Sequence, residues 1–341
     1  MKKFLLQGLF WGFILSSLNS YSYAAMLGEN KLIEWDETTF QSQYRSDIRM
    51  YDLFFIDYKI GDEPKFAFIS LSDDVHLYDE NNQQAIILIP GDEKESYQNE
   101  QYLLTDSYRA KFFELAGLSK DDNVFIYDYK HNDLTSLPIS QLNAFAVVDT
   151  TYYKAPFKQN DYIYGFKLDE KLFDHHSDYL VSFGKENPFA QEQLTPLSWK
   201  KISKDDFPVL DKNIEIASIG CHWPTDDLVK GDSYLSEVNG LQFYLQDYQK
   251  PSDPDTVLEH LIILDSDSNM ITNVSLCYSE GGGFKPLNNL ADKNEPIEQW
   301  TGKLLKNEPP VIFDFIYGCA PLFQFINLKH QFFAPKYYCL E

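Results

Sequence analysis

Two histidines and two aspartates lie within five residues of one another, at Asp174, His175, His176 and Asp178. Neutral imidazole nitrogens and carboxylate oxygens are ligands that suit a transition metal. Neighbouring residues of a strand point to opposite faces, so both histidines could bind one ion only from a loop. A solvated polar loop is the favoured interpretation, with a metal site as the alternative.

A second group of oxygen-bearing side chains alternates along the segment 265–269. Asp265, Asp267 and Asn269 are spaced as the first ligands of calcium loops are spaced. The sixth position of such a loop would be Met270 instead of glycine, and the twelfth would be Leu276 instead of glutamate. The segment is therefore not an EF-hand. A polar hairpin turn explains it equally well. We therefore expect no cofactor, with calcium as the alternative.

The four cysteines could act as nucleophiles, zinc ligands or disulfides. Cys221 precedes His222, and a histidine can activate a thiol. No CxxC or HxxxH spacing accompanies Cys221, Cys277, Cys319 and Cys339, which argues against zinc. The choice between a free thiol and a disulfide depends on the cellular compartment.

The first 24 residues indicate that compartment. Lys2 and Lys3 precede an apolar run from Phe4 to Leu15, and Ser22-Tyr23-Ala24 follows as a small-x-small cleavage site. This is the plan of a secretory signal peptide, so we expect residues 25–341 to be exported, to the periplasm or beyond, as a soluble chain. The alternative, a membrane anchor, would need about 20 apolar residues. We expect no membrane span in the mature chain.

Export favours disulfides over a reactive thiol. An even number of cysteines in an exported chain is typical of a disulfide framework. Three pairings are possible, and we favour Cys221–Cys277 with Cys319–Cys339 because each would join segments expected to be neighbouring strands. The sequence does not decide between the pairings.

The chain is strongly acidic, with a formal charge of −23, which becomes −25 when Lys2 and Lys3 are removed with the signal peptide. Such a surface repels nucleic acid and anionic membranes. It suits a basic protein or peptide, or a divalent cation. Acidity that serves only solubility is the alternative. The sequence does not set the oligomeric state.

The composition favours a mainly β fold with multi-stranded antiparallel sheets. Aromatic residues make up 16% of the chain, with 26 Phe and 23 Tyr, and these residues prefer strands. We expect short helices at about 105–117 and 297–305. Three segments, 54–62, 125–133 and 162–170, share an aromatic strand, a lysine and an acidic turn. Their spacing favours a β-propeller-like architecture over a β-sandwich or an irregular α+β fold.

The mature region can be one domain, with a candidate seam at 200–212 before the cysteine-bearing C-terminal part. No P-loop follows the glycines at 281–283, and no G-x-S-x-G motif is present. We therefore expect a non-enzymatic binding, inhibitor or immunity-type protein for a basic partner. The alternatives are an exported hydrolase acting on an envelope polymer or glycan, whose carboxylates the sequence does not select, and a structural or surface scaffold.

Overall fold

The computed structural model describes residues 44–56, 66–79, 84–90, 97–148, 153–175, 177–209, 217–219, 228–251, 253–277, 282–290, 296–317, 321–326 and 331–336. The expected signal peptide lies outside these residues. The fold is mainly β, with 47% strand and 11% helix, which confirms the prediction from composition. In the ranges just given, no helix is long and apolar enough to cross a membrane.

Four sheets contain most of the strands, and we number them by their place in the molecule. Sheet 1 has the order β2 (Phe54–Ile56), β3 (Phe66–Ser70), β10 (Tyr162–Leu168), β9 (Asn143–Val148) and β6 (Gln101–Leu103). Sheet 2 has the order β1 (Tyr51–Asp52), β11 (Tyr179–Gly184), β7 (Asn123–Asp128) and β8 (Asp133–Pro138).

Sheet 3 has the order β12 (Thr195–Pro196), β20 (Trp300–Gly302), β21 (Val311–Phe313), β23 (Phe323–Phe325) and β24 (Phe332–Phe333). Sheet 4 has the order β13 (Lys200–Ile202), β15 (Val229–Val238), β16 (Leu241–Lys250), β17 (Asp253–Leu264), β18 (Met270–Leu276) and β14 (Ala217–Ile219). Two short pairs complete the β structure, β4 (Tyr78–Asp79) with β5 (Gln84–Ala85) and β19 (Gly283–Phe284) with β22 (Ile316–Tyr317). The β14–β18 pair is parallel, and the other strand pairs of the described chain are antiparallel.

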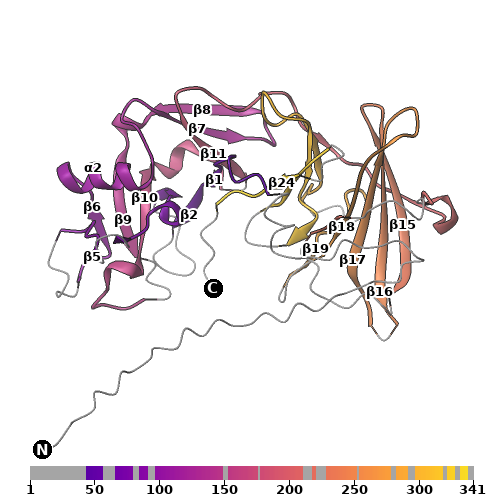
Figure 1. Cartoon of the computed structure of the whole chain (residues 1–341), viewed down its shortest axis with the longest axis horizontal. Coiled ribbons are helices and arrows are strands. Elements are labelled where there is room, and N and C mark those ends of the chain that lie inside the picture. Colours follow the sequence, from indigo (N-terminus) through magenta and orange to yellow (C-terminus); the bar gives the residue numbers. More distant parts are fainter. Residues whose placement is uncertain are drawn as a thin grey trace, which may run out of the picture.

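The sheets stack in a row, with a hydrophobic core between each neighbouring pair (Figure 1). β7 contributes side chains to two of these cores. Val124 and Ile126 face the core between sheets 1 and 2, whereas Phe125 and Tyr127 face the core between sheets 2 and 3. Successive residues of a strand point to opposite faces, so a strand buried on both faces has a continuous apolar run. β21 does the same between the second and third cores.

One of the two expected helices is present. α2 (Asp106–Leu115) follows Thr105 and buries Phe112 and Phe113 against the first core. Gly117 ends it with a φ of +63°, a conformation that costs glycine little. The helix expected at 297–305 was wrong, because β20 pairs with β12 and β21 there. The described residues also contain five 3₁₀ turns: Ser72–Asp74, Ile139–Gln141, Gln159–Asp161, Glu170–Leu172 and Lys204–Asp206.

The propeller-like arrangement is not confirmed, because no closed barrel or propeller is found in the described part of the chain. The proposed seam at 200–212 falls partly on β13, which pairs with β15 in sheet 4. The rest of the seam, from residue 210 onward, lies outside the described residues.

The first described strand is held in place by the end of the chain. The backbone N–H of Lys336 donates to the carbonyl of Met50, 2.8 Å away. Asp74 accepts hydrogen bonds from the Tyr51 hydroxyl, from Arg49 and from Lys336. These contacts hold the pKa of Asp74 below its ordinary value although burial opposes them. They also fix the position of Asp52, which follows Tyr51 in β1.

Sheet 4 buries two carboxyl groups side by side. Asp247 of β16 lies directly opposite Glu259 of β17, and the two residues are only 8% and 3% exposed. The Tyr234 hydroxyl donates to Asp247 at 3.2 Å, whereas Oε2 of Glu259 has no hydrogen-bond partner among the residues that the structure describes. Burial raises the pKa of Asp247 to about 6, and burial and Asp247 together raise the pKa of Glu259 well above its usual range. Glu259 is therefore held in its neutral form.

We expect this pair to make the protein less stable as the pH rises. Each of these carboxyls binds its proton more tightly in the folded chain than in the unfolded chain. Between the unfolded and the folded pKa of such a group, the free energy of unfolding falls by about 1.4 kcal/mol per pH unit. Glu259→Gln should keep the neutral form and flatten this loss between pH 5 and pH 8, as measured by urea unfolding. The exposed Glu186→Gln change is the control and should follow wild type. A Glu259→Gln curve parallel to wild type would show that Glu259 is already ionised at pH 5.

Candidate functional site

A polar cavity of about 400 Å³ opens where sheet 2 faces the segments that flank β21. Its walls are formed by residues far apart in the sequence, from residue 52 to residue 335. The lining combines three carboxyl groups with an ammonium group, an imidazole and several apolar side chains. The polar lining residues are Asp52, Tyr129, His175, Ser177, Asp178, Tyr179, Lys285 and Asp314.

Asp52 forms one side of the cavity. It pairs with Leu180 of β11, so its side chain projects from the same face of sheet 2 as Leu180. Burial, with a smaller effect from the charge of Asp178, raises its pKa to about 8, although the Leu53 backbone N–H lowers it somewhat. The described residues provide no salt-bridge partner for this carboxyl. Asp52 is therefore largely protonated at neutral pH.

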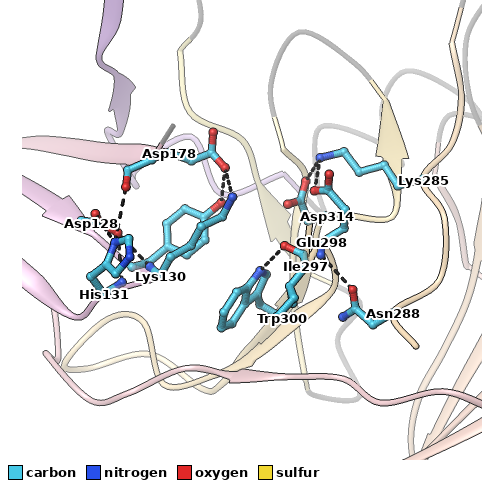
Figure 2. A network of polar contacts seen from close by, with 12 residues as sticks. Asp128, Lys130, His131, Asp178, Lys285, Asn288, Ile297, Glu298, Trp300 and Asp314 are labelled. Atoms are coloured by element: carbon cyan, nitrogen blue, oxygen red, sulfur yellow. Dashed lines mark hydrogen bonds and ion pairs between the residues drawn. The ribbon is translucent and has the colours of Figure 1, made fainter. Parts of the chain in front are cut away.

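Asp178 lies beside Asp52 but has a cationic partner. The ammonium group of Lys130 is 2.6 Å from Oδ2 of Asp178, and the Tyr129 hydroxyl donates to the same oxygen at 3.3 Å (Figure 2). Asp178 is exposed, whereas Tyr129 is fully buried. Burial raises the pKa of Tyr129 well above its usual range, and the nearby Asp178, Asp314 and Glu298 raise it further. Tyr129 therefore stands between the carboxyl groups of the two walls as a neutral hydrogen-bond donor.

The opposite wall contains a lysine shared by two carboxyl groups. Nζ of Lys285 is 2.8 Å from Glu298 and 2.5 Å from Asp314 (Figure 2). Burial raises the pKa of Asp314 to about 7 although Lys285 opposes the rise. Asp314 also has a φ of +77°, which is uncommon for a residue other than glycine. Strained, buried and titratable residues tend to gather at functional sites.

The structure places the residues of the expected metal cluster in separate contacts. The His175 ring stacks on Phe55 with a centroid distance of 4.2 Å, and Asp178 is directed to Lys130 and Tyr129. The backbone N–H of Asp174 donates to the Tyr179 hydroxyl, and His176 lies outside the described residues. Among the side chains that can be described, no group of three or more could hold a metal ion. His175 and Asp178 do reach the same cavity.

The candidate calcium residues form a turn that is bonded to itself. Oδ1 of Asp265 accepts the backbone N–H groups of Asp267 and Asn269, and Oδ2 accepts the Asn269 amide. These bonds account for the polar hairpin turn between β17 and β18, and they occupy both oxygens of Asp265. Calcium binding there stays a prediction.

One expected half-cystine is described. Cys277 is buried and takes part in a disulfide. Cys221, Cys319 and Cys339 lie outside the described residues, so the pairing that we favoured stays a prediction.

Sequence reasoning did not find Asp52, Asp314 or the lysines that bind the other carboxyls. A usable signal was present at both aspartates, because each interrupts an aromatic strand, in Tyr51-Asp52-Leu53 and in Phe313-Asp314-Phe315. A charged residue in such a run is costly to bury unless it is paired or neutral. Only the structure shows that the two interruptions meet at one cavity.

The cavity has an excess of acidic groups. Four carboxyls, those of Asp52, Asp178, Glu298 and Asp314, surround it or contact its lining, against the two ammonium groups of Lys130 and Lys285. Such a site can accept a cationic group, which would ionise Asp52, or can donate the Asp52 proton to a bound molecule. Comparison of the chain with protein-family models, curated proteins and solved structures finds no match, so these chemical properties carry the functional argument.

Proposed function

We propose that this protein is a non-enzymatic binding protein for a basic protein or peptide. It would act as an inhibitor or immunity-type protein toward that partner. The observation that carries the proposal is the Asp52 carboxyl at the wall of an acidic cavity, for which the described residues provide no salt-bridge partner. Burial disfavours the charged form of a carboxyl in that position, and a cationic ligand beside it would stabilise that form.

The charge of the whole chain supports the same partner. The formal charge of −23 produces a field that attracts cations and speeds their association. The field acts over about 10 Å at 0.1 M ionic strength, so binding that depends on it must weaken as salt is added.

The direct test is a calorimetric titration of the whole chain with a lysine-rich peptide, at 20 mM and at 300 mM salt. We expect the peptide to bind at low salt and to bind more weakly at high salt. Asp52→Asn should bind the peptide about tenfold more weakly, because the ion pair between Asp52 and a lysine of the peptide is lost. Asp267→Asn makes the same substitution at an exposed turn and is the matched control. Equal affinity for basic and acidic peptides, or affinity indifferent to salt, would contradict the proposal.

A second candidate function is hydrolysis of an envelope polymer or glycan. One observation favours it: a protonated carboxyl, Asp52, shares a cavity with a second carboxyl, Asp178, that forms a salt bridge with Lys130. Asp52 would protonate the leaving oxygen while Asp178 accepts a proton from the attacking water. Turnover of a glycan that falls a hundredfold or more in both Asp52→Asn and Asp178→Asn, but not in Asp267→Asn, would favour this function.

We also propose that the protein works outside the cytoplasm, after cleavage near residue 24. The signal-like N-terminus and the even number of cysteines support this location. Cell fractionation together with thiol titration of the unreduced, denatured chain tests it. Cytoplasmic protein with two or more free thiols would contradict it.

A further inference from the structure

We propose that the cavity beside Asp52 is a binding site for an alkylammonium group, such as the end of a lysine side chain, and that Asp52 is its counter-ion. This inference rests on the proposed function and names the part of the basic partner that enters the protein.

The protein's own lysines show how this lining binds an ammonium group. Lys130 reaches Asp178 at 2.6 Å, and Lys285 reaches both Glu298 and Asp314 at 2.8 Å and 2.5 Å. The side chains of both lysines are less than 20% exposed. Glu298 and Asp314 thus share one ammonium group in a largely buried site, and the exposed Asp178 has an ammonium group of its own. Asp52 is the remaining carboxyl of the lining, and the salt bridges found among the described residues leave it without a cation.

The apolar part of the lining suits an alkyl chain. Leu53, Phe54, Leu180 and Ile316 contribute to the same cavity as Asp52. A lysine side chain buries its methylene groups against apolar surface while its charged end seeks a polar partner. A ligand that carries an ammonium group on an unbranched chain therefore matches both kinds of wall.

The lining around Asp52 favours ammonium over guanidinium. A guanidinium group binds best when both oxygens of a carboxylate are free to accept two parallel hydrogen bonds. Arg45 shows this arrangement at a more open position, where Nε and Nη2 each lie 2.8 Å from an oxygen of Asp47. The neighbouring carboxyls of Asp178, Glu298 and Asp314 are instead all bound by lysine ammonium groups. An ammonium group acts as a compact charge and matches the way in which this lining already binds cations.

Binding must release a proton near neutral pH. Asp52 has a pKa of about 8, so the reaction there converts the carboxylic acid to a carboxylate and gives one proton to the buffer. The other charged or titratable groups that face it are Asp178, His175, Tyr129, Tyr179, Lys285 and Asp314, with Lys130 and Glu298 behind them. Proton release provides a readout on the wild-type protein that does not depend on any variant.

The probes are Nα-acetyl-lysine methylamide and Nα-acetyl-arginine methylamide, titrated into the full chain and followed by NMR. We expect the lysine derivative to shift signals of cavity residues and to bind at least tenfold more tightly than the arginine derivative. Asp52→Asn should weaken it tenfold or more, and Asp267→Asn should not. Calorimetry of the wild type at pH 7 in phosphate and in Tris should give different apparent heats, because a proton is released.

The outcomes separate this inference from the proposed function. A lysine-rich peptide that binds wild type and Asp52→Asn equally would keep the proposed function and overturn the ammonium site. Binding of the lysine derivative without binding of the peptide would keep the site and overturn the basic-peptide function. The site would be overturned if neither the peptide nor the lysine derivative binds. It would also be overturned if the heats in the two buffers are equal and Asp52→Asn leaves the affinity for the lysine derivative unchanged.

Discussion

Replacing Gly165 with alanine should lower the free energy of unfolding by about 3 kcal/mol, at the upper end of the usual cost of overpacking. Gly165 lies in the middle of β10, the central strand of sheet 1. A Cβ atom there would lie 1.9 Å from the carbonyl oxygen of Ile69 and 2.8 Å from the ring of Phe68. The oxygen belongs to the neighbouring strand β3, so it cannot move away without separating the two strands.

Urea unfolding followed by tryptophan fluorescence would measure the effect of Gly165→Ala. Gly283→Ala is the control, because a Cβ at Gly283 meets nothing within 4 Å. The control should unfold with the wild-type midpoint. A wild-type midpoint for Gly165→Ala as well would show that β3 and β10 are not held at the spacing seen in the structure.

Replacing Lys285 with methionine should destabilise the protein by about 3 kcal/mol at pH 8, as expected when one partner is removed from a buried ion pair. Glu298 and Asp314 are 11% and 4% exposed at their side chains and would be left close together without a cation. The loss should be smaller at pH 5, because burial already raises the pKa of Asp314 to about 7 and its protonation removes the repulsion.

Thermal unfolding at pH 5 and pH 8 would test Lys285→Met against the exposed Lys185→Met control. Addition of Asp314→Asn to the Lys285→Met protein should recover part of the stability at pH 8, since asparagine is uncharged and tolerates a positive φ. An equal loss at both pH values would show that lost packing of the lysine chain, and not the two carboxyls, is responsible.

The strands of the first three sheets could be predicted from the sequence where their apolar runs were long. The aromatic segments at 125–133 and 162–170 were expected to begin with strands, and they overlap β7 and β10, because these strands are buried and rich in aromatic or β-branched residues. Segment 297–305 was mistaken for a helix because pairing between strands far apart in sequence decided its conformation. Local propensity yields to such tertiary contacts.

The stack of four sheets could not be predicted, since it depends on which faces pack together. The repeated strand, lysine and acidic turn suggested equivalent units, yet Lys130 and Lys167 have different roles. Lys130 pairs with Asp178 at the cavity, whereas Lys167 lies 4.0 Å from the centre of the Phe66 ring in sheet 1. A shared local pattern therefore did not imply a shared place in the fold.

The candidate site was predicted only in part. His175 and Asp178 stood out by their neighbours in sequence, and both line the cavity. Asp52, Lys285 and Asp314 come from three distant segments, and only the packing of sheet 2 against the strands near β21 brings them together. The acidity of the chain pointed to a cationic partner, and the cavity beside Asp52 is the place where we propose that this partner binds.

Burial holds the Asp52 carboxyl neutral at the cavity wall, where the described residues provide it with no cation. An NMR titration of the ¹³C carboxyl signals of wild type would measure this directly, with Asp52 assigned by its absence in Asp52→Asn. We expect the Asp52 signal to titrate with a pKa near 8, and we expect saturating Nα-acetyl-lysine methylamide to lower this pKa. A pKa near the ordinary value of about 4, unchanged by the lysine derivative, would show that Asp52 is neither held neutral nor the counter-ion of an ammonium group.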